Sequence, residues 1–137
     1  MQYGAPSIQL TAGGNIRPFR IVKISTAADS TVLESASATS TNIGVAQEGT
    51  RRAPGTGDDD GFAAIAGENI EVLGPGSGTA RVQLTGTSTR GDAITSDANG
   101  LGTTTTTEGD CIIGWALQSG VAADVVRVLM QPCYMAT

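Results

Sequence analysis

A short apolar segment that occurs twice constrains the fold of this chain more than any other feature. Thr41-Asn42-Ile43-Gly44-Val45-Ala46-Gln47 returns near the other end as Cys111-Ile112-Ile113-Gly114-Trp115-Ala116-Leu117-Gln118. The shared core is Ile-Gly-(Val/Trp)-Ala, with a Gln one or two residues later. β-Branched residues around an internal glycine are typical of a buried strand that another backbone approaches closely. The sequence therefore predicts two buried strands of one kind.

The surroundings of the two segments also correspond. Arg17-Pro18-Phe19-Arg20-Ile21-Val22 precedes the first, and Arg90-Gly91-Asp92-Ala93-Ile94-Thr95 precedes the second. Gly67-Glu68-Asn69-Ile70-Glu71-Val72-Leu73 follows the first, and Ala122-Ala123-Asp124-Val125-Val126-Arg127-Val128-Leu129 follows the second. This self-similarity predicts a duplicated β unit, with halves at about 16–73 and 79–130. Chance similarity between two buried strands is the alternative.

Composition favours an all-β domain. The 137 residues fit one domain, and 19 of them are glycine, while aromatic residues make up only 4%. Small residues, turn signals and short apolar runs predict a small β-barrel or sandwich of mostly short antiparallel strands with long loops. Charged residues are 15% of the chain, against roughly a quarter in an average soluble domain. This low charge indicates that a partner covers part of the surface.

The two ends are predicted to lie outside the central domain. Residues 1–15 have the features of an N-terminal arm, in which Ser7-Ile8-Gln9-Leu10-Thr11 alternates as an edge strand does. Such a strand pairs either with another chain's sheet or as the first strand of its own fold. The first strong strand is expected over Phe19–Ser25, and residues 131–137 are expected to form a C-terminal tail.

A long loop is predicted at residues 48–61, and long loops in compact domains are often functional. It carries Arg51-Arg52 and Asp58-Asp59-Asp60. Calcium loops space their ligands, so three adjacent aspartates favour a solvated acidic turn over a Ca²⁺ site. The arginine pair is suited to acidic groups of the loop or of a partner.

The sequence offers little for catalysis. It contains no histidine, which removes His-based triads and the commonest general base. Glu48, Glu68, Glu71 and Asp92 are the acids near predicted elements, and nothing in the sequence brings two of them together. Cys111 and Cys133 fit no metal-ligand spacing and are expected to be free thiols. We therefore expect no enzyme, no cofactor and no metal site.

Other function classes are disfavoured as well. The net charge is −5 and the basic residues are scattered, which disfavours nucleic-acid binding. The Gly-rich segment 74–78 precedes an alternating strand rather than a helix, unlike a phosphate-binding loop. The sequence contains no apolar run of about 18 residues, so no membrane span is predicted. The N-terminus shows no secretory signal pattern.

A series of motifs, taken in order, resembles small phage proteins of the capsid decoration, or head cement, type. The motifs are Leu10-Thr11-Ala12-Gly13-Gly14, Ile21-Val22-Lys23, Ile43-Gly44-Val45-Ala46, Val82-Gln83-Leu84-Thr85-Gly86, Arg90-Gly91-Asp92-Ala93-Ile94-Thr95-Ser96-Asp97-Ala98-Asn99-Gly100, Ile113-Gly114-Trp115-Ala116-Leu117 and Val126-Arg127-Val128-Leu129. Together they span about residues 8–130. Each motif alone has only the general features of a strand or a turn. The chain departs from the pattern at 48–61, around 67–74 and from Gln131 onward.

This resemblance implies a non-enzymatic virion protein on the outer surface of an icosahedral head, made in the host cytoplasm. Its implied partners are the major capsid protein and two further copies of itself in a homotrimer. Residues 1–12 would add a strand to a capsid subunit. The candidates for capsid contact are Tyr3, Pro6, Ile8, Leu10, Arg51 and Arg52. Trp115 and Tyr134 are candidates for the core or the oligomer interface.

Two other interpretations remain open. One is a different virion β module, such as a head fibre base or a tail-associated protein. The other is a carbohydrate-binding β module, which would need several exposed aromatic residues for stacking, whereas the sole tryptophan lies in a predicted core strand.

Overall fold

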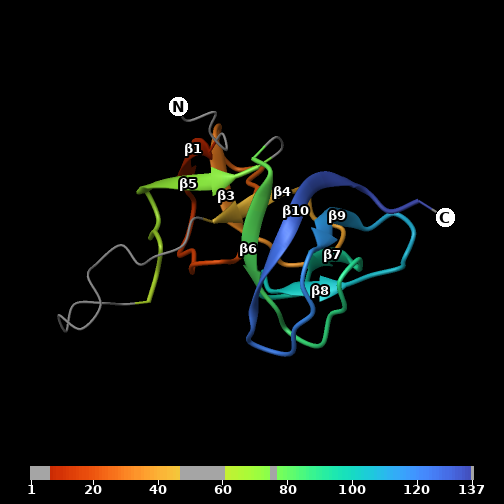
Figure 1. Cartoon of the computed structure of the whole chain (residues 1–137). Coiled ribbons are helices and arrows are strands. Elements are labelled where there is room, and N and C mark those ends of the chain that lie inside the picture. Colours follow the sequence, from red (N-terminus) through yellow and green to blue (C-terminus); the bar gives the residue numbers. More distant parts are fainter. Residues whose placement is uncertain (1–6, 47–60, 75–76, 137) are drawn as a thin grey trace.

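The computed structural model describes residues 7–46, 61–74 and 77–136, and every regular element in them is a β-strand (Figure 1). The strands are β1 (Ser7–Ala12), β2 (Ile21–Ile24), β3 (Thr31–Glu34), β4 (Asn42–Ala46), β5 (Asn69–Leu73), β6 (Thr79–Gln83), β7 (Ala93–Ser96), β8 (Gly102–Thr104), β9 (Cys111–Ala116) and β10 (Val125–Tyr134). The all-β prediction is confirmed. Across these ranges, no helix of the length and apolarity needed for a membrane crossing is present.

The first five strands form a closed barrel in the order β1-β3-β2-β4-β5. β1 pairs with β5 antiparallel from Ser7↔Leu73 to Thr11↔Asn69, and with β3 in parallel through Thr11↔Thr31 and Ala12↔Val32. Residues 7–12 are thus the first strand of the chain's own barrel, which was the alternative to an arm. The first half accordingly begins before residue 16.

The last five strands form a second sheet in the order β6-β10-β9-β7-β8. A single parallel bridge, Leu84↔Gly102, joins the segment after β6 to β8. If β6 to β10 are read as counterparts of β1 to β5, the two sheets have the same cyclic order of strands. The parallel contact between β1 and β3 then corresponds to the parallel bridge at β8.

The register of the strands matches between the halves. Val22 lies opposite Gly44 as Ile94 lies opposite Gly114, and Val45 lies opposite Leu73 as Trp115 lies opposite Leu129. A Cβ at Gly44 would overlap the carbonyl oxygen of Leu73, and one at Gly114 would overlap that of Leu129. The repeated Ile-Gly motif therefore has one physical reason in both halves, a close approach of the next strand.

The turn before β2 corrects two details of the sequence analysis. Phe19 was expected to begin a strand, but it lies in a turn with φ 62°, and β2 begins at Ile21. A residue with positive φ cannot continue a β-strand. Since Val22 matches Ile94, Phe19 takes the place of Gly91, whose φ is 93°. The alignment of Arg17 with Arg90 is therefore wrong by one residue.

The turns before β5 and β10 correspond without a shift. Gly67 has φ 89° and its counterpart Ala123 has φ 72°. The Ile65 amide donates to the Glu68 carboxylate at 3.0 Å, as the Val121 amide donates to the Asp124 carboxylate at 2.9 Å. β10 itself runs to Tyr134, so the tail expected to begin at residue 131 is in its first part a strand paired with β9.

Two apolar clusters form the core, and the larger one joins the halves. The first barrel encloses Ala12, Ile16, Val22, Val32, Ala46, Ala64, Ile70 and Val72. The second cluster contains Ile21 and Val45 of the first half, and Leu73 packs against it. Its members from the second half are Ala80, Val82, Leu84, Ile94, Ile113, Ala116, Val126, Val128 and Met130. Ile21, Val45 and Leu73 lie on the outer face of the first barrel, so this face is buried against the second sheet.

Candidate interaction surfaces

Two of the residues proposed for capsid contact lie in β1. Ile8 is 38% exposed, whereas Leu10 is half-buried and packs against the core of the first barrel. Donation of residues 7–11 to another sheet would break their pairing with β5. Tyr3, Pro6, Arg51 and Arg52 lie outside the described residues, as do the three consecutive aspartates. Of the proposed contacts, Ile8 is therefore the described one with an accessible side chain.

The acidic residues singled out above serve turns and strand pairs. The Glu68 carboxylate accepts from the Ile65 amide, and that of Asp92 accepts from the Thr89 amide at 2.9 Å. Glu71 accepts a 2.8 Å hydrogen bond from Gln9, and Glu48 lies outside the described residues. In the part of the chain that the structure describes, no group of three His, Cys, Asp or Glu side chains is placed to hold a metal ion.

Arg17 forms an ion pair within the first half, whereas Arg20 connects the two halves. Arg17 forms a forked contact with Glu34, at 3.1 Å from Nε and 2.9 Å from Nη2, and this hydrogen bonding raises the pKa of Arg17. Arg20 is 9% exposed and donates from Nη1 to the Asn99 carbonyl at 2.9 Å. Burial lowers the pKa of Arg20. Beside it, the Ile21 amide donates to the Gly100 carbonyl at 2.8 Å.

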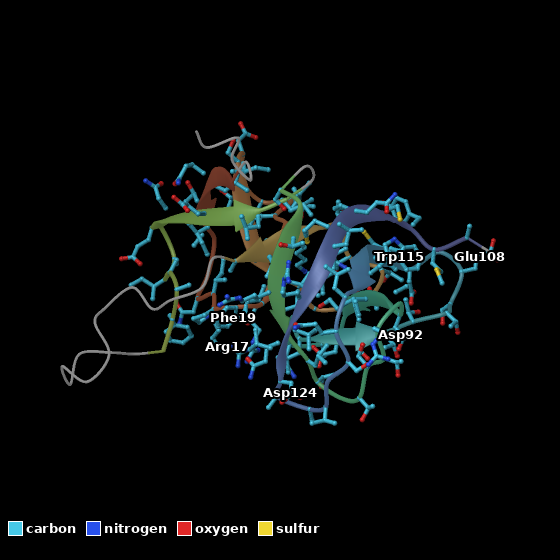
Figure 2. All side chains as sticks on the ribbon, in the orientation of Figure 1. Arg17, Phe19, Asp92, Glu108, Trp115 and Asp124 are labelled. Atoms are coloured by element: carbon cyan, nitrogen blue, oxygen red, sulfur yellow. The ribbon has the colours of Figure 1, made fainter. Side chains whose placement is uncertain are left out.

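Trp115 is neither a core residue nor an isolated surface residue. It is half-buried on β9, where Figure 2 labels it. It lies opposite Leu129, and its indole N–H donates to Gln131 at 3.2 Å. On its other side is a hollow of about 270 Å³, lined in part by Asp92, Thr105 and Met135. Tyr134, at the end of β10, is 66% exposed. The two candidates for the core or the oligomer interface thus differ in burial, with Trp115 half-buried and Tyr134 mostly exposed.

Around Trp115 the second sheet presents an exposed face that the sequence analysis missed. We call it the outer face and define it by Arg81, Trp115, Leu117, Val125, Arg127 and Leu129. Val125, Leu129 and Leu117 are 40%, 42% and 43% exposed. Along β10 these positions alternate with the buried Val126, Val128 and Met130. This alternation is visible in the sequence, and it predicts which residues of the strand lie on each of its two faces.

Two arginines of the outer face lie directly opposite each other. Arg81 of β6 pairs with Arg127 of β10 in the strand register. Both line a pocket of about 300 Å³, together with Phe19 and Leu73 of the first half. Like charges at directly opposed positions are unfavourable in an isolated sheet. The counterparts in the first barrel, Gln9 and Glu71, form a hydrogen bond with each other.

Comparison with known proteins bears on the fold. No family model matches the chain, and no curated protein matches it significantly. Among solved structures, the chain is similar to the crystal structure of the head fibre gp8.5 N base of bacteriophage phi29. The TM-score is 0.57 at 14% sequence identity, over 96% of this chain and 98% of that chain. The likeness is one of fold, and it extends over nearly the full length of both chains.

Proposed function

We propose that this protein is a non-enzymatic structural component of a phage virion, attached to the outer surface of the head as a homotrimer. The observation that carries the proposal is the likeness to the phi29 head fibre base, which spans nearly the full length of both chains. The ordered motifs shared with head decoration proteins support the same class of function. The low charged content supports a surface that is partly covered by partners.

In this proposal, the protein is attached to the head by many weak contacts. A surface with few charges can be buried against repeated capsid sites with little desolvation of charge. A trimer engages several capsid subunits at once, so that avidity multiplies weak single contacts. Within this proposal, Ile8 supplies an apolar contact and Arg51-Arg52 supply cationic contacts to the major capsid protein.

The test is saturable binding to heads of the phage that encodes the protein. Purified protein is mixed with heads lacking it, the heads are sedimented, and bound copies are counted against capsid subunits. We expect a fixed ratio at saturation and a reduced affinity for Arg51→Ala/Arg52→Ala, with a weaker salt dependence. The absence of co-sedimentation at any concentration would refute attachment to the head.

Two functions at the head are distinguished by a second measurement. A cement protein raises the temperature at which heads rupture, because it bridges neighbouring capsid subunits. A fibre base binds the heads without this effect and holds a further segment or protein away from them. The likeness to a fibre base favours the second function, and the decoration motifs favour the first. Heat rupture of heads with and without bound protein decides between them.

A further inference from the structure

The hollow beside Trp115 forms where a small residue lies between two larger ones on neighbouring strands. Ala93 of β7 lies opposite Trp115, and on its other side the Thr105 amide donates to the Ala93 carbonyl at 3.1 Å. Ala93 is 5% exposed and lines the hollow together with Trp115 and Thr105. In the register that both halves share, the larger Ile21 has the position of Ala93. The hollow thus follows from an alanine at this position of the second sheet.

Hydrogen bonds hold the side walls of the hollow in place. The Met135 amide donates to the Asp110 carbonyl at 2.7 Å, and the Thr105 hydroxyl donates to the Asp110 carboxylate at 2.5 Å. On the opposite side, the indole N–H of Trp115 is taken up by Gln131. A site whose lining is fixed before binding loses less conformational entropy when a ligand enters.

Polar groups complete the lining next to the tryptophan ring. The Asp92 carboxylate accepts from the Thr89 amide through Oδ2 at 2.9 Å, and among the described residues its Oδ1 has no hydrogen-bond donor. Thr104 and Thr106 are exposed, and they also line the hollow. A volume of about 270 Å³ therefore brings together an aromatic ring, a carboxylate oxygen and two hydroxyl-bearing side chains.

This combination matches the chemistry of a sugar ring. A pyranose has an apolar C–H face, which suits the ring of Trp115, and hydroxyl groups around its edge. A carboxylate oxygen such as Asp92 Oδ1 accepts a strong, charge-assisted hydrogen bond from a hydroxyl. The volume lies just below the range of about 300–1,000 Å³ for drug-sized ligands, which suits one sugar unit. The negative charge of Asp92 disfavours acidic sugars.

A cationic ligand fits the hollow less well. Ammonium groups are recognised by cages of several aromatic faces, whereas Trp115 is the one aromatic side chain among the described residues that line the hollow. The several exposed aromatic residues expected of a carbohydrate-binding module stack along an extended glycan. One ring is sufficient for a single sugar unit at the end of a glycan.

We propose that this hollow is a binding site for one neutral pyranose unit of a glycan. Trp115 stacks on the apolar face of the sugar, and Asp92, Thr104 and Thr106 form hydrogen bonds with its hydroxyl groups. The site goes beyond the proposed function and does not depend on attachment to heads, so that each can fail without the other.

The sole tryptophan of the chain lines the hollow, so its fluorescence reports binding directly. Purified protein is titrated with the methyl glycosides of glucose, galactose, mannose and N-acetylglucosamine, and saturation-transfer NMR confirms each contact. Glucuronic acid and tetramethylammonium are the acidic and cationic comparisons. We expect saturable binding of at least one neutral glycoside, with a dissociation constant on the order of 1 mM. Both comparison probes are expected to bind at least about tenfold more weakly.

Two variants test the location of the site. Ala93→Ile introduces the residue that the first barrel has at this position, and it should fill the hollow and abolish binding. Its control is Ala36→Ile, which adds the same side chain at an exposed alanine outside the lining and should leave binding unchanged. Asp92→Asn keeps an oxygen that can accept from the Thr89 amide, and it should raise the dissociation constant about tenfold. Far-UV circular dichroism checks that the variants are folded.

Three results would overturn the inference. The first is the absence of saturable binding for every neutral glycoside up to about 100 mM. The second is binding to Asp92→Asn and to folded Ala93→Ile with the affinity of the wild type. The third is a preference for tetramethylammonium over every sugar, which would make the hollow a cation site instead.

Discussion

At the scale of single residues, the two glycines of the repeated motif are the most tightly constrained positions. A Cβ at Gly44 or Gly114 would overlap a carbonyl of the neighbouring strand. We expect Gly44→Ala and Gly114→Ala each to lower the free energy of unfolding by about 1–3 kcal/mol or more, because the strands must move apart. Urea unfolding measures this loss.

Gly86 is the control for this prediction, since a Cβ there meets nothing within 4 Å and its φ is not positive. Gly86→Ala is expected to change the free energy of unfolding by no more than about 0.5 kcal/mol. If all three variants were equally stable, the close approach of the strands could not be the reason for the repeated Ile-Gly.

The two cysteines are expected to differ in reactivity. Both are free, Cys133 is exposed, and Cys111 is 4% exposed, with burial raising the pKa of its thiol. The thiolate is the reactive form, so a raised pKa and poor access both slow the reaction of Cys111. At pH 8 a thiol reagent should label Cys133 quickly and Cys111 only after denaturation. Rapid labelling of folded Cys133→Ser would contradict this prediction.

At the scale of elements, the sequence was most informative where both halves repeat a physical requirement. The Ile-Gly strands and the turns at Gly67 and Ala123 were matched correctly, because close packing and turn geometry restrict which residues fit. The turn at Phe19 was missed, since a phenylalanine with positive φ carries no local signal and occupies the place of Gly91.

The candidate site was less predictable. Trp115 was identified as a core or interface residue. Whether its face of β9 is covered depends on how the first barrel packs against the second sheet. That depends on contacts between distant segments, such as the packing of Ile21 and Val45 into the second half. The pairing of Arg81 with Arg127 likewise follows from the register of β6 and β10.

The connection after β4 provides a test at the element scale. In the first half, residues 47–63 connect Ala46 to Ala64, whereas in the second half Leu117-Gln118-Ser119 connects Ala116 to Gly120. The residues on either side of the two connections correspond. The Ala46 amide donates to the Arg20 carbonyl as the Ala116 amide donates to the Asp92 carbonyl. Likewise, Ile16 forms a β-bridge with Ala64 as Ser88 does with Gly120. Replacing 47–63 by Leu-Gln-Ser should therefore preserve cooperative unfolding, since a shorter loop costs less closure entropy.

The same replacement should weaken head binding, because it removes Arg51 and Arg52. A Gly/Ser segment of unchanged length in place of 47–60 is the control that separates loop length from side-chain chemistry. Loss of folding in the short variant alone would show that the two connections are not interchangeable.

At the scale of the whole molecule, the two halves share a core and should behave as one cooperative unit. The closed first barrel has its own cluster, but the cluster of the second sheet is completed by Ile21 and Val45. Hydrogen bonds from Arg20 and the Ile21 amide to the segment between β7 and β8 reinforce the junction. The second half is therefore expected to depend on the first for its stability.

Ile21→Ala tests this dependence, since the residue lies in β2 but packs into the second half. We expect a loss of about 2–5 kcal/mol in the free energy of unfolding, from lost burial and the cavity left behind. Native-state hydrogen exchange should show reduced protection in β6, β9 and β10 as well as in β2, with one unfolding transition. Ile24→Ala in the same strand, where the side chain is 47% exposed, should cost no more than about 0.5 kcal/mol. Because the barrel core does not include Ile21, reduced protection confined to β1–β5 would contradict a shared core and indicate two units that fold independently.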